Sequence, residues 1–138
     1  MTAQQYLNQA RRLNDFIESD KRELERLWSQ ATGLSGADFF ERVQGTPTDN
    51  GIDGIVEKII ELKHKINNEL EQCIALKNEI WDTINTVKND EERLLLRLRY
   101  IEFMRWTDIS IKMRYSERRT YKIHGQALKN VVIPESVQ

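Results

Sequence analysis

Residues 106–129 read WTDISIKMRYSERRTYKIHGQALK, and this stretch decides how the last third of the chain folds. Its apolar residues recur at helical spacing on both sides of a polar break that begins at Arg114. Ser116 follows the break, and a serine hydroxyl can accept hydrogen bonds from the first backbone N–H groups of a helix. The stretch predicts a short helix over 106–113, a tight turn, and a helix from Ser116 to about Val131. The inward-facing residues are expected to be Trp106, Ile109, Met113, Ile123, Ala127 and Leu128.

A third amphipathic stretch precedes these two helices. Asp90 has the chemistry of an N-cap, and two acidic residues follow it in the first turn. We expect this helix to run from there to about Met104. None of the three short helices can bury its apolar side alone, so the sequence predicts a trihelical helix-turn-helix unit over residues 89–132. The apolar residues of the first of them are Leu94, Leu95, Leu98, Ile101 and Phe103.

Two long segments upstream, about 2–31 and 52–87, carry apolar residues at alternating spacings of three and four, the pattern of a coiled-coil seam. Asp20 falls on the seam, and we expect it at the open rim of the contact because a buried carboxylate is costly unless it is paired. The pattern predicts a long antiparallel helical (coiled-coil) hairpin over residues 1–88, so the fold class is all-α. The seam residues are Tyr6, Ala10, Leu13, Ile17, Leu24, Leu27, Ala31, Ile52, Ile55, Ile59, Leu62, Ile66, Leu70, Cys73, Leu76, Ile80, Ile84 and Val87.

Residues 32–50 join the two long helices and have a different composition. They contain three glycines and one proline, and they show no regular spacing. We expect a long loop in which Phe39, Phe40 and Val43 form a short apolar turn against the hairpin. At the other end of the chain, residues 133–138 include a proline and are expected to form a flexible tail.

Basic side chains are concentrated in the last third of a chain that is nearly neutral. The whole chain has a formal net charge of −1, but residues 88–138 carry eleven basic and seven acidic side chains. Such asymmetry favours nucleic-acid contact. The single cysteine, Cys73, cannot form an internal disulfide, and no apolar run has the length of a signal peptide or a membrane span. We therefore expect a protein of the reducing cytoplasm with no membrane partner.

The last predicted helix has a basic N-terminal half on its outer side. Glu117, Arg118, Tyr121 and Lys122 lie opposite the apolar positions, and Arg119 lies at the side. In a helix-turn-helix, this half of the second helix enters the major groove of DNA. Arg and Lys can bond guanine edges there, and Glu can accept from cytosine. Neighbouring cations and the helix N-terminus hold phosphates. The stretch therefore predicts a site for double-stranded DNA.

The quoted stretch resembles region four of bacterial sigma factors, the element that recognises the upstream promoter hexamer. The whole chain is similar to a family of small phage and prophage proteins of Gram-positive bacteria, related to the RinA and ArpU groups of phage late-gene regulators. The resemblance implies a sigma-like transcription regulator, encoded by a bacteriophage or prophage, that acts in late gene expression in the cytoplasm of the bacterial host cell. The residues that carry the resemblance are Tyr6-Leu7, Arg99-Tyr100, Trp106, Ser116, Arg119, Ile123-His124, Ala127-Leu128 and Lys129.

The resemblance also implies roles for individual residues. By position, Glu117, Arg118 and Lys122 match the base-contacting places of the sigma recognition helix. The sigma pattern has a basic and then an acidic residue where this chain has Glu117 and then Arg118. We therefore expect the protein to read a DNA sequence other than the usual upstream hexamer.

Other residues are expected to contact phosphates and set the register. Arg119 and Tyr121 match phosphate-contacting or backbone-facing places, and Ser116 and Arg114 join them at the turn. Arg114 stands where helix-turn-helix units often have glycine, and a left-handed residue other than glycine costs about 1–2 kcal/mol. Ser110 stands where a small alanine is common, which preserves close helix packing.

The remaining reactive side chains have simpler explanations than catalysis or metal binding. His124 is expected to be a packed or surface histidine. His64 and Cys73 are nine residues apart on one helix, so they do not share a face in metal-ligand spacing. No Ser/His/Asp or Cys/His constellation and no Gly-rich phosphate loop occurs in the sequence. We expect no enzymatic activity, metal, cofactor or small-molecule substrate. The residues expected to anchor a core or interface are Trp28, Trp81 and Trp106.

The hairpin leaves a second function open. Ile60, Ile74, Trp81 and Trp28 fall beside the seam, and such spare apolar surface often supports dimerisation or packing on a neighbouring domain. The first hypothesis is a sequence-specific DNA-binding regulator whose hairpin forms a homodimer or contacts RNA polymerase. A homodimer would present two recognition helices to two half-sites. The alternative is a helical protein-interaction module that binds RNA polymerase or another host protein without DNA affinity of its own.

Overall fold

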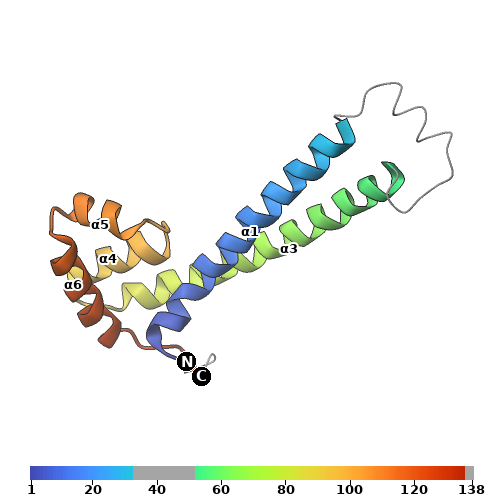
Figure 1. Cartoon of the computed structure of the whole chain (residues 1–138). Helices are drawn as coiled ribbons and strands as arrows, with labels where there is room; N and C mark the ends of the chain where they lie inside the picture. The colour runs from blue at the N-terminus through green and yellow to red at the C-terminus, as the bar shows by residue number, and fades with distance from the viewer. Residues whose placement is uncertain (33–51, 136–138) are drawn as a thin grey trace. The chain divides into compact units, whose positions relative to one another are not determined.

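A computed structural model describes residues 1–32 and 52–135, and no strand occurs in them, which confirms the all-α class (Figure 1). The predicted loop with Phe39, Phe40 and Val43 lies outside the described residues, as do residues 136–138 of the predicted tail. No described helix has the length and apolar character needed to cross a membrane. The helices are α1 (Ala3–Thr32), α3 (Ile52–Asn85), α4 (Asp90–Tyr100), α5 (Trp106–Met113) and α6 (Glu117–Lys129).

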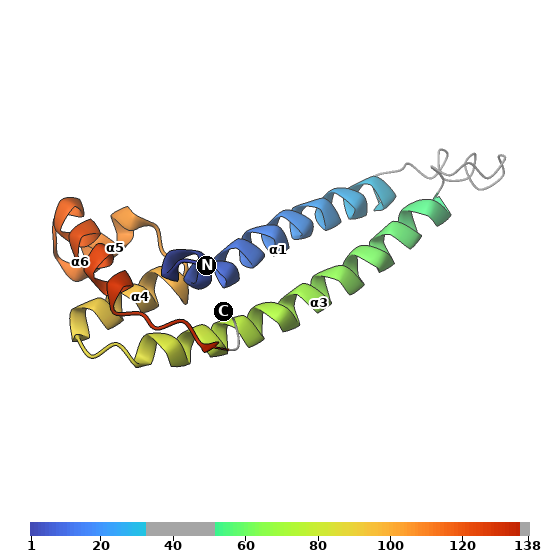
Figure 2. The same cartoon turned by 90° about the horizontal axis from the view of Figure 1, so that it is seen from below.

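The chain forms two compact units. The larger unit combines Met1–Asn14 with Gln72–Gln138, and the smaller unit is Asp15–Glu71. In the larger unit, the first turns of α1 and the last turns of α3 accompany α4, α5 and α6 (Figure 2). This division differs from the expected boundary at residue 88. The first turns of α1 and the last turns of α3 share buried residues with α4 and α6 and so belong to their unit.

The core of the larger unit has two parts, and α4 contributes to both. Leu96 and Tyr100 of α4 belong to the first part, and Leu95 and Leu98 belong to the second. Successive residues of a helix point about 100° apart, so one short leucine-rich helix can bury two sides. Each fully buried leucine stabilises the fold by about 1.5–3 kcal/mol. The other buried members are Tyr6, Leu7, Ala10, Ile80, Ile84, Val87, Ala127 and Val131 in the first part, and Ile109 and Ile123 in the second.

The start of α4 corrects one sequence prediction. The N-cap is Asn89 and not Asp90, because the Asn89 side chain accepts a hydrogen bond of 3.0 Å from the backbone N–H of Glu92. Asp90 is instead the first helical residue, where its carboxylate pairs with Arg93. Asn and Asp cap helices about equally well, so composition alone does not distinguish the two positions.

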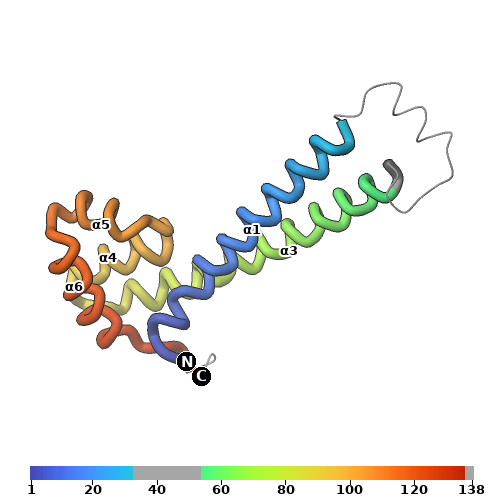
Figure 3. The backbone as a smooth tube through the Cα atoms, in the orientation of Figure 1, coloured from blue at the N-terminus to red at the C-terminus, as the bar shows by residue number. Residues whose placement is uncertain are grey.

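The end of α4 also differs from the prediction. The helix stops at Tyr100 and not near Met104, and the chain reverses before α5 (Figure 3). Phe103 adopts a left-handed conformation with φ 57°. A right-handed α-helix cannot continue through a residue in this conformation. The backbone N–H of Met104 then donates to the carbonyl of Leu98 at 3.0 Å. This tight reversal brings α5 back against α4.

The smaller unit is formed by segments of α1 and α3. Its buried cluster consists of Leu27, Ile55 and Ile59. The predicted seam is wrong at Leu70, which is 37 % exposed, whereas the Glu69 side chain is only 13 % exposed. Glu69 lies three residues after the buried Ile66 and so continues the heptad spacing. The position along the helix therefore determines that Glu69 faces inward here. The apolar character of Leu70 does not determine it.

Asp20 lies in this seam and not at an open rim, so that prediction is also wrong. Its side chain is 17 % exposed, and the Nζ atom of Lys65 lies 3.2 Å from its Oδ2. The same Nζ atom lies 3.5 Å from Oε1 of Glu69. Burial and then the neighbouring Asp20 carboxylate raise the pKa of Glu69, while Lys65 acts in the opposite direction. The contact between α1 and α3 in the smaller unit therefore contains two carboxyl groups, of Asp20 and Glu69, and the ammonium group of Lys65.

Candidate nucleic-acid interface

A tight left-handed turn connects α5 to α6. Arg114 has φ 61° and ψ 40°, as expected for the position that glycine often holds. The next residue, Tyr115, donates its backbone N–H to the carbonyl of Ser110 at 3.1 Å. Ser116 is extended and caps α6, because its Oγ atom accepts from the backbone N–H of Arg119 at 3.1 Å. The predicted cap and the predicted turn position are both confirmed.

Small polar side chains hold α5 against α6. The buried Ser110 hydroxyl lies 3.1 Å from the Thr120 hydroxyl, which donates to the carbonyl of Ser116 at 2.9 Å. Two short side chains allow the helices to approach closely while each hydroxyl keeps a partner. Sequence reasoning named Ser110 but missed Thr120. The burial of Thr120 could have been predicted from its helical spacing to the apolar residues three and seven positions later.

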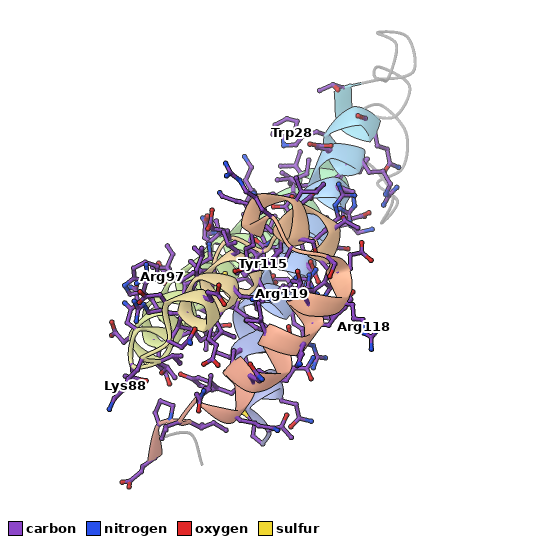
Figure 4. The ribbon with its side chains drawn as sticks, turned by 90° about the vertical axis from the view of Figure 1, so that its left-hand side faces the viewer. Trp28, Lys88, Arg97, Tyr115, Arg118 and Arg119 are labelled. Atoms are coloured by element: carbon purple, nitrogen blue, oxygen red, sulfur yellow. The ribbon has the colours of Figure 1, made fainter. Side chains whose placement is uncertain are left out.

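The outer side of α6 carries the residues predicted to face DNA. Glu117, Arg118, Arg119, Tyr121 and Lys122 are all exposed. Figure 4 shows Arg118 extending away from the ribbon, while Arg119 lies beside the Tyr115 side chain. On the inner side, the predicted inward residues of this helix are buried or half-buried: Ile123, Ala127 and Leu128.

Arg119 is held in place by an aromatic ring. Its guanidinium carbon lies 4.4 Å from the ring centroid of Tyr115, and the Tyr115 hydroxyl donates to Oε1 of Glu91 on α4. The hydrogen bond to Glu91, followed by burial, raises the pKa of the Tyr115 hydroxyl. An arginine stacked on a fixed ring loses less side-chain freedom when it binds an anion. Sequence reasoning missed Glu91 and Tyr115, because the contact joins residues on different helices.

A buried histidine on the inner side of α6 connects this helix to α4. His124 of α6 is 8 % exposed, and its Nε2 atom shares a hydrogen bond of 2.6 Å with the hydroxyl of Tyr100 on α4. Burial, followed by the charge of Arg99, lowers the pKa of His124 to about 4. Burial likewise raises the pKa of Tyr100 to about 12. Both shifts keep the pair uncharged at neutral pH, so His124 is a packed histidine, one of its two expected roles.

Trp106 completes this cluster at the start of α5. Its ring centroid lies 4.6 Å from that of His124, and the guanidinium carbon of Arg99 lies 4.6 Å from the Trp106 ring. The ring of Tyr121, on the exposed side of α6, lies 5.0 Å from Trp106. The structure thus gathers into one cluster several residues on which the sequence resemblance rests. The cluster fixes the orientation of α6 relative to α4 and α5 within their unit.

Three cations of α6 remain available, whereas some other cations of the same unit are already engaged. Arg97 of α4, for example, stacks on the ring of Trp81, with 4.3 Å between its guanidinium carbon and the ring centroid. Arg118, Lys122 and Lys129 are exposed, and no hydrogen bond or ion pair of their side chains occurs within the described ranges 1–32 and 52–135. Exposed unpaired cations on one helix form a surface that suits a polyanion.

Within the part of the chain that the structure describes, no group of three His, Cys, Asp or Glu side chains is placed to hold a metal ion. Cys73 is buried, with its Sγ atom 3.7 Å from the carbonyl of Ala10. His64 is exposed on α3. Both residues belong to α3 and not to the helices that carry the candidate interface.

These features define a small all-α protein in which a capped helix presents unpaired cations above a partly buried aromatic cluster. The chain belongs to the family described as Protein of unknown function (DUF1492), whose sequence model matches residues 34–132. Comparison with curated proteins and with solved structures found no match.

Proposed function

We propose that the protein binds duplex DNA sequence-specifically and regulates transcription, with α5 and α6 acting as a helix-turn-helix. The observation that carries the proposal is the outer side of α6, where Arg118 and Lys122 are exposed and unpaired within the described residues. The major groove is about 12 Å wide and admits an α-helix. The N-terminal turns of α6 would enter the groove, since the basic residues predicted to read DNA lie there.

Three residues of these turns are assigned to the base edges: Glu117, Arg118 and Lys122. The arginine and the lysine can donate to guanine O6 and N7, and the glutamate can accept from the amino group of cytosine. Arg118 is the strongest candidate because its planar guanidinium can make two parallel hydrogen bonds to one guanine.

Four other residues are assigned to phosphates and register: Ser116, Arg119, Tyr121 and Arg114. Arg119 is already stacked on Tyr115, so it can contact a phosphate without a large loss of side-chain entropy. Tyr121 rests against Trp106 and is exposed on the outer side of the helix. Contacts of this kind position a protein on DNA and make its affinity depend on salt.

The proposed biological role rests on the resemblance to sigma region four and, for the whole chain, to the family of small phage and prophage proteins related to late-gene regulators. We propose a sigma-like regulator, encoded by a phage or prophage and acting on late gene expression in the bacterial cytoplasm. RNA polymerase is a second proposed partner, and a homodimer of the chain would present two copies of α6 to two half-sites. Catalysis and cofactors have no part in this proposal.

Binding of a labelled duplex at increasing salt tests the proposal. We expect the affinity of the full chain to fall steeply with salt. Arg119→Ala should weaken binding to every sequence and reduce the salt slope by about one. Arg118→Ala should change the preference at one base pair by about 1–3 kcal/mol. Arg22→Ala removes an exposed cation of the smaller unit and serves as the control, with unchanged binding. Equal losses in all three variants would contradict the assigned interface.

A second candidate function rests on exposed apolar side chains. In the smaller unit, Trp28 is 45 % exposed and Ile60 is 50 % exposed. Exposed apolar groups of this size favour a protein-interaction module that binds RNA polymerase or another host protein. Capture of purified RNA polymerase that Trp28→Ala/Ile60→Ala abolishes, together with no duplex binding by the parent chain, would favour this function over DNA binding.

A further inference from the structure

Gly125 interrupts the exposed side of α6 at a place where the fold has no need of a glycine. A Cβ atom there would meet no heavy atom within 4 Å. No described glycine has a positive φ, so the backbone conformation does not require glycine either. Glycine inside a helix is destabilising relative to alanine. Close approach by an external molecule is another reason for glycine at such a position.

Gly125 lies at the centre of the outer side of α6. Helical spacing places Tyr121 one turn before it, Arg118 two turns before it and Lys129 one turn after it. These three side chains are exposed, whereas Ala127, on the opposite side of the helix, is fully buried. Long polar side chains therefore flank a short strip of bare helix backbone.

We infer that the sugar–phosphate backbone of duplex DNA passes over Gly125, with a phosphate held between the Tyr121 hydroxyl and the Lys129 ammonium group. At about 1.5 Å per residue, Gly125 lies about 10 Å along the helix axis from Arg118. The major groove is about 12 Å wide. With Arg118 at the base edges, Gly125 therefore reaches the wall of the groove, where the phosphates lie.

The missing side chain matters because phosphate contacts require a short distance. Tyr121 and Lys129 are hydrogen-bond donors, and phosphate oxygens accept from them. A hydrogen bond is lost beyond about 3.5 Å, so a methyl group that holds the DNA backbone away from α6 weakens both contacts. The inference rests on the proposed function and adds Gly125 and Lys129 to the interface.

The test compares full-length variants on a labelled mixed-sequence duplex at low salt, with a thermal melt of each protein. We expect Gly125→Ala to melt about 2–6 °C higher than the parent, because alanine favours the helix. It should nevertheless bind at least about fivefold more weakly, because its methyl group occupies a tight contact. Lys129→Ala should reduce the salt slope by about one. Gln126→Ala, on the flank of the same helix, is the matched control and should bind as the parent does.

The outcomes separate this inference from the proposed function. If Gly125→Ala melts higher and binds as tightly as the parent, DNA does not approach Gly125, although the proposed function stands. If Lys129→Ala keeps the parent salt slope, the phosphate does not lie at Lys129. If the parent itself retains no duplex at low salt, the proposed function fails, and the role assigned to Gly125 fails with it.

Discussion

Acidification should destabilise the larger unit through one buried side chain. His124 lies beneath α6, 8 % exposed, with its Nε2 atom 2.6 Å from the hydroxyl of Tyr100. Burial, followed by the charge of Arg99, lowers its pKa from 6.5 to about 4. The unfolded chain takes up a proton at His124 near the higher value, and the folded chain does so only near the lower one. Between the two values unfolding takes up a proton, so the free energy of unfolding falls as the pH falls.

The size of this effect follows from the shift. Each unit of pKa difference corresponds to about 1.4 kcal/mol, so a fall from 6.5 to about 4 corresponds to about 3 kcal/mol. This contribution is fully present above the unfolded pKa and is lost by the time the pH reaches the folded pKa. A loss of this size is a large part of the roughly 5–15 kcal/mol that stabilises a typical domain.

Urea denaturation of the parent and of His124→Asn, across the interval between the two pKa values, measures the effect. Asparagine keeps a polar amide at this position but does not titrate, so the variant shows the contribution of all other groups. We expect the parent to lose about 3 kcal/mol more than the variant over this interval. NMR titration of the His124 ring in the folded parent gives the pKa directly, even if the variant folds poorly.

Two results would refute this reasoning. The first is a His124 ring that titrates near 6.5 in the folded parent, the value of an unperturbed histidine. The second is a parallel loss of stability in the parent and in His124→Asn. Either result would mean that His124 is solvated and does not hold α6 in place.

Three further predictions concern local stability and are checked by thermal or urea denaturation. Arg114→Gly should stabilise the chain by about 1 kcal/mol, because glycine relieves the left-handed conformation; no gain, or the same gain in Arg114→Ala, would contradict this. Ser116→Ala should cost about 1 kcal/mol, because the first turn of α6 loses its cap; an unchanged midpoint would show that the cap contributes little. Glu69→Leu should stabilise the smaller unit by on the order of 1 kcal/mol, because it removes one of two adjacent carboxyl groups. In the parent, the raised pKa of Glu69 stabilises the fold below the unfolded pKa, and this stabilisation is lost as the pH rises through the folded pKa. A parent whose smaller unit gains no stability relative to Glu69→Leu on acidification would contradict the assignment.

Local signals predicted α5 and the start of α6 closely. The bounds of α5 agree with the prediction, and α6 begins directly after the predicted cap at Ser116. Caps and turns depend on residues close in sequence, so they can be recognised from a few positions. The exposure of Arg118 and Lys122 followed in the same way from the spacing of the apolar residues on one helix.

Predictions failed where two neighbouring residues could fill one role. At the start of α4, Asn89 and Asp90 are both good caps, and the backbone selects Asn89. In the seam of α3, an apolar preference favours Leu70, but the heptad phase turns Glu69 inward. In both cases the decision depends on helix phase and packing, which composition does not contain.

The support for α6 could not be predicted because it joins distant residues. Tyr100 and His124 are 24 residues apart, as are Glu91 and Tyr115. A histidine or tyrosine has no periodic signal that reveals its hydrogen-bond partner on another helix. The sequence therefore predicted which side chains of α6 are exposed, but not the contacts that hold them in position.

Selection from a randomised duplex pool tests the central claim most directly. The purified full chain and the variant Arg118→Ala/Arg119→Ala/Lys122→Ala would each be incubated with the pool at near-physiological salt, and the retained DNA would be sequenced. We predict that the parent enriches one sequence motif and that the triple variant does not, because the unpaired cations of α6 carry the readout. Absence of any retained motif with the parent, or the same motif with the triple variant, would contradict the claim that α6 reads DNA.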